Sequence, residues 1–152
     1  MQANKHLLSI TKIVRLKEIG LVRAGMFTTL ANIENTPVLH AIPTFFLPKK
    51  TEKITEKKVQ NEFFVLKVKG DSMQPRIYED DFIIVQYLPN INEIPSGDII
   101  VLSDDDDHII VKQLYKKDNQ CKLISYNEAY KPIEFSDDFN VFGKVVGFYG
   151  KL

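Results

Sequence analysis

The sequence predicts a mainly β protein, with a compact, twisted, all-β domain over residues 61–152 and an extended N-terminal arm over residues 1–60. From Asn61 onward, short runs rich in Val, Ile, Phe and Tyr alternate with clusters of Pro, Gly, Asn and Asp, which is typical of strands and turns. No helix-length amphipathic pattern occurs in that part of the chain. A hydrophobic content of 44% is sufficient for a packed core.

The arm is predicted to be irregular as far as residue 48, because Pro37, Pro43 and Pro48 interrupt its short apolar runs. Residues 49–60, KKTEKITEKKVQ, are charged and lack glycine, so we expect a solvent-exposed connector or loop. Two adjacent helical periods are absent from the first 60 residues, so no helix-turn-helix is expected there. The arm is predicted to connect to the β domain without a domain of its own.

The β domain is predicted to contain six strands. Their sequences are FFVLKVK (63–69), FIIVQY (82–87), DIIVL (98–102), HIIVKQLY (108–115), CKLISY (121–126) and FNVFGKVVGFY (139–149). Alternation along the first strand places Phe64, Leu66 and Val68 on one face. One helical turn is expected just after Ser72.

Charge is unevenly distributed along a chain whose net charge is zero. Residues 1–69 hold 12 Lys and Arg against 5 Asp and Glu, whereas residues 70–152 hold 8 against 15. The β domain is therefore not expected to bind DNA directly, because contact with phosphates requires clustered cations. The basic arm suits an acidic partner or its own acidic domain, and solvated lysines on a linker are an equal alternative.

The same composition favours a cytoplasmic protein. Cys121 is the only cysteine, so no internal disulfide can form, and it is expected to be a semi-buried strand residue. No run approaches the roughly 18 apolar residues of a membrane helix, and the first 20 residues do not resemble a signal peptide. We therefore expect no membrane association.

Ser72 is the candidate nucleophile. It lies in Gly70-Asp71-Ser72-Met73-Gln74-Pro75, directly after a predicted strand. Glycine at a strand end allows a sharp turn and a close approach of backbone N–H groups to a reacting carbonyl. The hydroxyl of Ser72 would then be accessible at the tip of the turn. On local grounds alone, a polar turn without chemistry is the favoured interpretation of GDSM.

A serine nucleophile needs a base, and the histidines do not fit that role. His6 lies near the terminus, His40 in the irregular arm, and His108 after four aspartates at the start of a strand. Each is expected to be a surface or turn histidine. A buried, neutral lysine can replace histidine as base.

Lys112 is the candidate base because it lies inside IIVKQLY, on the same strand face as Ile110 and Leu114. Burial among aliphatic neighbours disfavours the ammonium form and lowers the pKa of a lysine. An edge-strand or snorkelling lysine is the alternative interpretation.

Five segments occur in an order that resembles the LexA/UmuD-type self-cleaving peptidases, the family of SOS-response proteins and phage repressors. They are FFVLKVKGDSMQPRIYEDDFIIV, SGDIIVL, IIVKQLY, YNEAYKPI and VFGKVVGFY. The resemblance covers residues 61–152 and extends weakly back to about residue 14. It implies a Ser72–Lys112 dyad, with the backbone amides of Asp71 and Ser72 as oxyanion hole.

The family's substrate is an Ala-Gly or Cys-Gly bond of its own chain, which implies cleavage between Ala24 and Gly25 in VRAGMF. It further implies a homodimer, a RecA filament on single-stranded DNA as the trigger, and no cofactor or metal. Two features depart from the family pattern: Glu79-Asp80-Asp81 replaces the usual D-G-D, and the span from Gly25 to Ser72 is long, with residues 49–60 as the expected insertion.

Several functions are compatible with these motifs. Residues 1–24 are too few for a DNA-binding domain, which favours a UmuD-like protein whose cleaved form partners a translesion DNA polymerase. The alternative is the self-cleaving C-terminal part of a LexA-like or phage-type repressor. A non-catalytic binding module of the same fold is a third possibility. Signal peptidases share the Ser-Met-x-Pro pattern and a strand lysine, but they need a membrane anchor.

Overall fold

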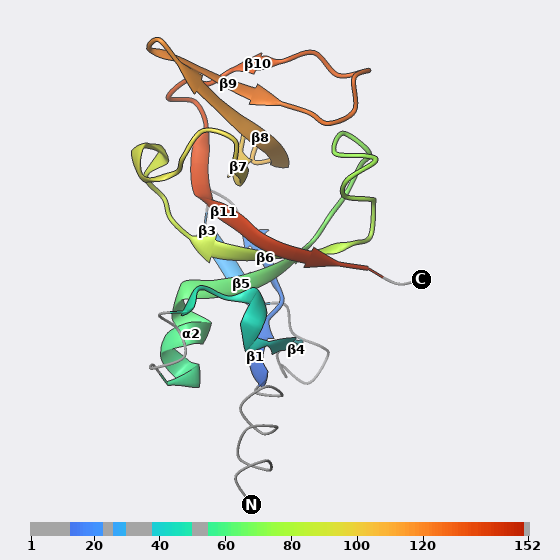
Figure 1. The fold of residues 1–152 in the computed structure, drawn as a ribbon, viewed down its shortest axis with the longest axis vertical. Helices are drawn as coiled ribbons and strands as arrows, with labels where there is room; N and C mark the ends of the chain where they lie inside the picture. The colour runs from blue at the N-terminus through green and yellow to red at the C-terminus, as the bar shows by residue number, and fades with distance from the viewer. Residues whose placement is uncertain (1–12, 23–25, 30–37, 50–54, 151–152) are drawn as a thin grey trace, which may run out of the picture.

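The structure, a computed structural model, describes residues 13–22, 26–29, 38–49 and 55–150. The mainly β prediction is confirmed (Figure 1). The strands are β1 (Ile13–Lys17), β2 (Ile19–Val22), β3 (Met26–Thr29), β4 (Leu39–Pro43), β5 (Phe63–Lys67), β6 (Phe82–Tyr87), β7 (Ile99–Ser103), β8 (Ile109–Lys117), β9 (Gln120–Ile124), β10 (Ile133–Glu134) and β11 (Asn140–Tyr149). The helical elements are α2 (Glu56–Glu62) and the 3-10 turns η1 (Thr44–Phe46) and η3 (Ile91–Glu93).

Seven strands form one antiparallel sheet in the order β10-β9-β8-β7-β11-β6-β5. The six predicted strands are all present, and β10 is a short addition that the sequence did not predict. β11, the last of them along the chain, lies in the interior of the sheet between β6 and β7 (Figure 1). It therefore joins β5 and β6 to the strands β7 to β10.

The sheet buries both of its faces near β5. Phe64, Leu66 and Val68 belong to one core cluster, as alternation predicted. Phe63 and Val65, which point the opposite way, belong to a second cluster. β5 can bury both faces because the described part of the arm covers one of them.

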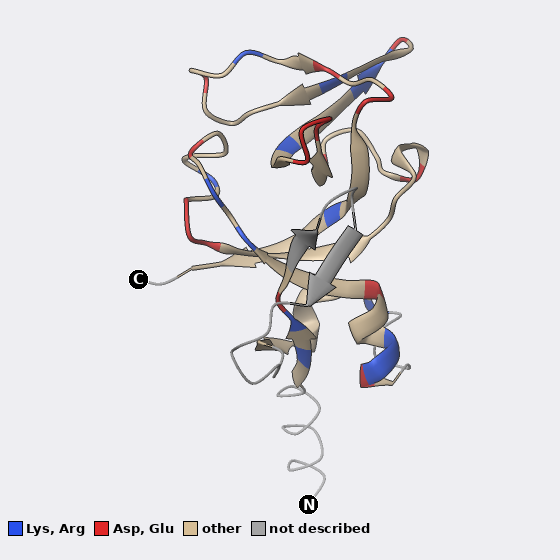
Figure 2. Cartoon of the chain, turned by 180° about the vertical axis from the view of Figure 1, so that it is seen from behind, with Lys and Arg blue, Asp and Glu red and all other residues tan. Residues whose placement is uncertain are grey.

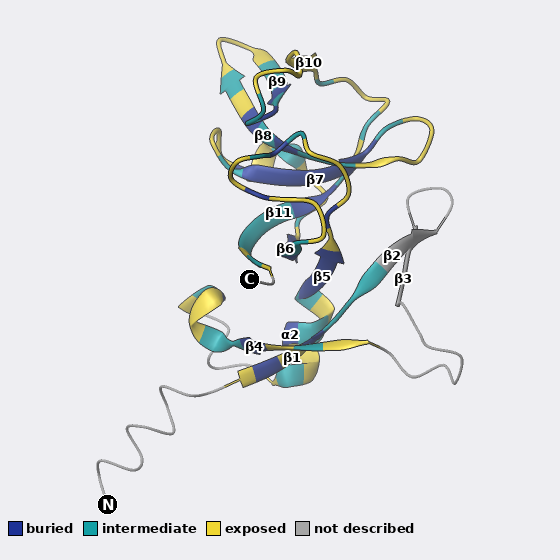
Figure 3. Ribbon diagram, turned by 90° about the vertical axis from the view of Figure 1, so that its right-hand side faces the viewer, coloured by how far each residue is buried: buried dark blue, intermediate teal, exposed yellow. Residues whose placement is uncertain are grey.

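The arm contains regular structure, so the prediction of an irregular segment as far as residue 48 is wrong for its described part. β1 pairs with β4 in antiparallel register, and Leu16 on β1 is fully buried. Leu16 and Ile42 pack in the second cluster with residues of β5 and β6. Figure 3 shows β1, β4 and α2 together below β5. Strand pairing between segments some 25 residues apart leaves no local sequence signal.

The expected charged connector contains a helix from residue 56, and the loop prediction is wrong there. Thr55 caps α2, since its hydroxyl accepts a hydrogen bond from the Lys58 N–H at 3.3 Å. Val59 is 1% exposed and packs in the second core cluster. Lys57 and Lys58 are exposed, and Figure 2 shows this part of α2 in blue. The division of the chain at residue 60 stays a prediction.

His40 is not a surface histidine, contrary to expectation. Its ring is half-buried and lies 2.7 Å from the Glu18 carboxylate through Nε2, while the Tyr149 hydroxyl contacts Nδ1. Burial, with the nearby charge of Glu18, raises the pKa of Tyr149 to about 12. This network joins the described arm to the end of β11. No serine hydroxyl hydrogen-bonds to it among the residues that the structure describes.

Among the described helices, none is both long enough and apolar enough to span a bilayer.

Candidate active site

The predicted nucleophile lies on a tight turn anchored in the core. Gly70 ends the extended chain after β5 with φ of 82°, a left-handed conformation that favours glycine. The Ile77 N–H donates to the Met73 carbonyl at 3.0 Å, which is the spacing of one α-helical turn. The side chains of Met73 and Ile77 are 2% and 0% exposed. The predicted helical turn after Ser72 is therefore present, and its packing fixes the position of that residue.

Ser72 lines a cleft of about 430 Å³. The cleft walls come from the end of β5, the nucleophile turn and the start of β8, and they combine apolar side chains such as Leu66 and Ile110 with polar groups such as His108. The backbone N–H groups of Asp71 and Ser72 have no hydrogen-bond acceptor in the described part of the chain. Ser72 is thus the part of the nucleophile turn at which a peptide in this cleft would meet a hydroxyl, whereas Asp71 is not among the residues that line the cleft.

Lys112 is 6% exposed and is the only residue of a charged type among the buried residues that the structure describes. Its amine donates a hydrogen bond of 2.8 Å to the Ser125 hydroxyl. Loss of solvation on burial lowers the pKa of Lys112 below its ordinary value of 10.5. The edge-strand alternative is excluded, because β8 is paired on both sides and the amine is buried.

The amine also faces the ring of Tyr130, whose centroid lies 5.3 Å from Lys112 Nζ. An aromatic face favours the ammonium form and so opposes the effect of burial. The pKa of Lys112 is nevertheless lowered.

A short segment after β9 connects the lysine to the nucleophile turn. Ser125 contacts Lys112, and two residues further on the Asn127 N–H donates to the Ser72 carbonyl at 2.9 Å. The Asn127 side-chain amide donates to the Asp71 carbonyl at 3.2 Å, and the Tyr130 hydroxyl donates to the Asp71 carboxylate. This segment, residues 125–130, we call the bridge. It brings Ser72 and Lys112, which lie 40 positions apart, to one region.

The two predicted dyad residues do not hydrogen-bond to each other in this structure. The Lys112 amine donates to Ser125, and no bond between Ser72 Oγ and Lys112 Nζ occurs among the described residues. Catalytic hydrogen bonds are often long before substrate binds. The roles of Ser72 and Lys112, and of the Asp71 and Ser72 amides, therefore stay predictions.

Sequence reasoning missed Ser125. Its relevance depends on the β8–β9 register, whose last pair is Gln113 and Ile124. Continued by one residue beyond the end of β9, this register places Ser125 opposite Lys112, and the two side chains form a hydrogen bond. The hairpin KKDNQ was visible as a turn, and counting outward from it would have put a hydroxyl opposite the buried lysine.

The predicted scissile pair, Ala24 and Gly25, lies outside the described residues. The strands on either side are described: β2 and β3 are antiparallel, and their pairing extends to Val22 opposite Met26. Ile19, at the start of β2, packs against the core cluster that contains Met73.

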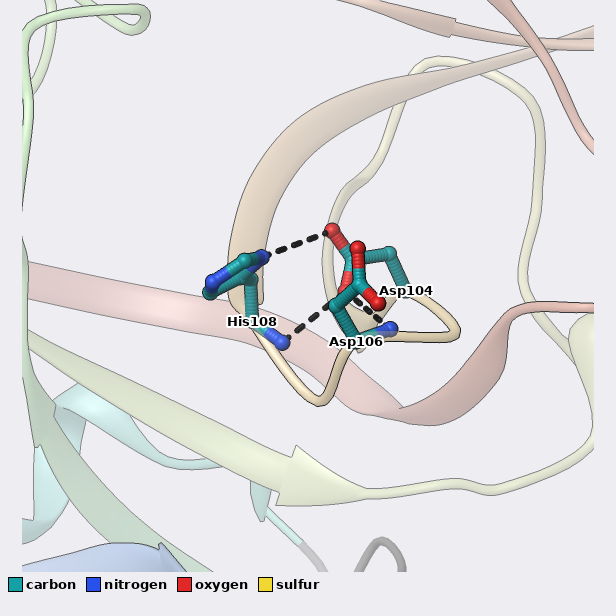
Figure 4. Close-up of side chains that lie close together, drawn as sticks. All are labelled: Asp104, Asp106 and His108. Atoms are coloured by element: carbon teal, nitrogen blue, oxygen red, sulfur yellow. Dashed lines mark hydrogen bonds and ion pairs between the residues drawn. The ribbon is translucent and has the colours of Figure 1, made fainter.

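Asp104, Asp106 and His108 form the only arrangement of metal-type ligands found among the described residues, with ligand atoms within 4.8 Å of one another (Figure 4). Asp104 accepts hydrogen bonds of 2.9 Å from the N–H groups of both Asp106 and His108. Burial works to raise the pKa of the Asp104 carboxyl, but these hydrogen bonds outweigh it and the pKa is lowered. These contacts stabilise the turn between β7 and β8, which accounts for the close approach of the three side chains. No metal site was predicted from the sequence.

Comparison with known proteins gives the family. Residues 19–146 match the family model described as Peptidase S24-like. The chain belongs to this family. It is therefore a member of the LexA/UmuD-type self-cleaving peptidases, as the motifs from residue 61 onward predicted. The match begins within the arm, in β2, so the Peptidase S24-like family includes part of the segment that precedes the β domain.

Several LexA repressors are similar to this Peptidase S24-like chain. The LexA repressor of Acetivibrio thermocellus is 32% identical over 150 residues, which cover 97% of this chain and 62% of the relative. That of Bacillus velezensis is 29% identical over 140 residues, 91% of this chain and 60% of the relative. That of Staphylococcus aureus strain Newman is 33% identical over 153 residues, which cover 99% of this chain and 66% of the relative. The chain spans about three fifths of the length of these curated relatives.

Proposed function

We propose that this chain cleaves its own backbone between Ala24 and Gly25, with Ser72 as nucleophile and Lys112 as general base. The observation that supports the proposal is the buried Lys112 amine, whose pKa is lowered and which hydrogen-bonds to Ser125 of the bridge, while Asn127 of the bridge donates to the Ser72 carbonyl. Solvent-exposed lysines are protonated at neutral pH and cannot accept a proton. A desolvated lysine can.

In the proposed reaction the Ser72 hydroxyl proton passes to Lys112 as Oγ attacks the Ala24 carbonyl carbon. The N–H groups of Asp71 and Ser72 stabilise the oxyanion. The bond to Gly25 breaks, and the Lys112 ammonium returns the proton to the departing amine. Lys112 then activates a water molecule, which hydrolyses the ester on Ser72. Because the bond belongs to the same chain, its delivery to the cleft controls the rate.

Incubation of the purified chain at alkaline pH tests this reaction. We expect a fragment that begins at Gly25, at a rate that rises with pH as Lys112 loses its proton. Mass spectrometry identifies the new N-terminus, and Ser72→Ala and Lys112→Ala should each abolish the fragment. An intact wild-type chain would support the non-catalytic binding module instead. A cleavage rate that stays flat from neutral pH to about pH 10 would argue against a lysine base.

The cellular role is a separate part of the proposal. The relatives described above are LexA repressors, which supports a repressor-type role in which cleavage acts in the SOS response. The UmuD-like role, as accessory to a translesion polymerase, stays a prediction from the sequence. We propose a RecA filament on single-stranded DNA as the trigger and a homodimer as the assembled form. Adding RecA, single-stranded DNA and an ATP analogue at neutral pH should accelerate cleavage, and sedimentation should give the mass of a dimer.

A further inference from the structure

We infer that Ser125 is a positioning residue for the Lys112 base, an inference that rests on the proposed function. The observation is the 2.8 Å hydrogen bond from Lys112 Nζ to Ser125 Oγ, between residues that are 6% and 8% exposed. A buried lysine amine can rotate about its side-chain bonds, and its lone pair must point at the Ser72 hydroxyl to accept a proton. An N–H of the amine that is donated to Ser125 restricts this rotation.

Ser125 is itself a poor candidate for the nucleophile. It is buried, whereas Ser72 lines the cleft and Ser125 does not contribute to the cleft walls. A hydroxyl that accepts from the amine and cannot meet a peptide is suited to holding the base.

The bridge gives Ser125 a fixed position relative to the nucleophile. Asn127, two residues after Ser125, donates hydrogen bonds to the carbonyls of Ser72 and Asp71. Tyr130 of the bridge donates to the Asp71 carboxylate. Displacement of the nucleophile turn would therefore move the bridge as well. The bridge thus couples the orientation of the amine to the position of the Ser72 hydroxyl.

The hydroxyl of Ser125 also affects the protonation of Lys112. As an acceptor it stabilises the ammonium form more than the neutral amine, because hydrogen bonds to charged groups are stronger. Removal of Ser125 is therefore expected to lower the pKa of Lys112 further. A variant that merely disturbed the site would cleave more slowly without a lower pKa of Lys112. Measuring both the rate and the pKa therefore distinguishes this case from loss of the Ser125 hydrogen bond.

The test compares Ser125→Ala, Ser125→Thr and Ser103→Ala in the full chain. Ser103 is the matched control, because it is a fully buried serine of the same sheet whose hydroxyl has no partner among the described residues. We expect Ser125→Ala to lower the limiting rate of alkaline self-cleavage about tenfold or more. Ser125→Thr keeps the acceptor and should retain the rate within about threefold, and Ser103→Ala should leave it unchanged.

A second readout does not depend on cleavage. In a Ser72→Ala background, titration of the Lys112 side-chain ¹³C signal should give a pKa that is lower by about 1 in Ser125→Ala, given the usual strength of a hydrogen bond to a charged group. A lower pKa together with a lower limiting rate is the signature of lost orientation. If Ser125→Ala does not fold, Ser125→Cys, with a weak sulfur acceptor, carries the same expectations.

The outcomes separate the two claims. No cleavage by the wild-type chain overturns the proposed function and this inference with it. If the wild-type chain cleaves itself and Ser125→Ala cleaves at the same limiting rate, the inference about Ser125 is overturned and the proposed function is not. An unchanged Lys112 pKa in Ser125→Ala overturns it as well, since the hydrogen bond would then have no influence on the amine.

Discussion

At the scale of single residues, burial is the cause of the lowered pKa of Lys112. The amine has one hydrogen-bonding side chain, Ser125, and no carboxylate pairs with it among the described residues. Burial without a counter-charge disfavours the ammonium form, whose solvation is lost. The folded state therefore binds this proton less tightly than the unfolded chain does. The consequence is a measurable link between stability and pH.

Lys112→Met should remove the dependence of folding stability on pH that Lys112 causes. Between the lowered pKa of Lys112 and its ordinary value of 10.5, the unfolded chain binds more protons than the folded protein, so raising the pH stabilises the folded state. This gain is complete above 10.5 and is lost as the pH falls. Measured by urea unfolding in a Ser72→Ala background, Lys112→Met should be more stable relative to the parent near neutral pH, and its advantage should shrink as the pH rises.

The exposed Lys117 of the same strand provides the control. The free energy of unfolding of Lys117→Met, plotted against pH, should run parallel to that of the parent. Parallel curves for Lys112→Met as well would contradict a lowered pKa in the folded protein.

Residue patterns predicted the candidate base and nucleophile but not their contacts. Lys112 stood out because its neighbours in the sequence are aliphatic, and burial followed from strand alternation. The Ser125 contact depends on the register of β8 and β9. The contacts of Asn127 depend on where the segment after β9 meets the turn that carries Ser72. Such partners are set by register and tertiary packing, which a single sequence encodes only indirectly.

At the scale of elements, β11 passes unusually close to β6. An added Cβ at Gly143 would lie 1.9 Å from the Gln86 carbonyl oxygen, a backbone atom that cannot move aside. β11 also shifts register next to this residue, between Val141 and Gly143, where it pairs with β7. Glycine here permits two neighbouring backbones to approach in the middle of the sheet.

Gly143→Ala should therefore destabilise the fold by about 2 kcal/mol or more, because one of the two strands must shift. Gly147 on the same strand is the comparison, since the atoms nearest to an added Cβ are side-chain atoms, with the partly exposed Phe46 ring at 3.2 Å. Gly147→Ala should cost at most about 1 kcal/mol. Thermal or urea unfolding of both variants measures the difference, and equal costs would argue against the close approach.

The elements that the sequence did not predict share one physical reason. Strands from residue 63 onward follow one another closely and carry strong β composition, so local pattern was sufficient. β1 and β4 are short and pair across a long stretch of chain, and each is stabilised by burial against β5 rather than by its own composition. Helix α2 has a local signal in the capping Thr55, but the charged, lysine-rich stretch 49–60 in which it begins resembled a connector.

At the scale of the molecule, the described arm and the large sheet share a core. Leu16 and Ile42 of the arm lie in one cluster with Phe63, Val65 and Ile84. The Glu18, His40 and Tyr149 network joins the same two parts. This packing indicates that the described arm folds together with the sheet and does not trail from it.

Leu16→Ala should lower the free energy of unfolding of the whole protein by about 2–4 kcal/mol, as for other fully buried leucines. Ile13→Ala, on the same strand but 54% exposed, should change it by less than about 0.5 kcal/mol. Unfolding followed by circular dichroism and by Tyr fluorescence should coincide in both variants. A Leu16→Ala protein as stable as its parent would show that the arm contributes nothing to the global fold.

The interior position of β11 determines when the large sheet can be completed during synthesis. The ribosome makes residue 72 and residue 112 before residues 140–149, yet strand β11 is what connects the β5–β6 half of the sheet to the β7–β10 half. While β11 is still inside the ribosomal tunnel, the halves that carry serine and lysine have no common sheet. Under the proposed function, we therefore expect self-cleavage to begin only after β11 has left the ribosome and joined the sheet.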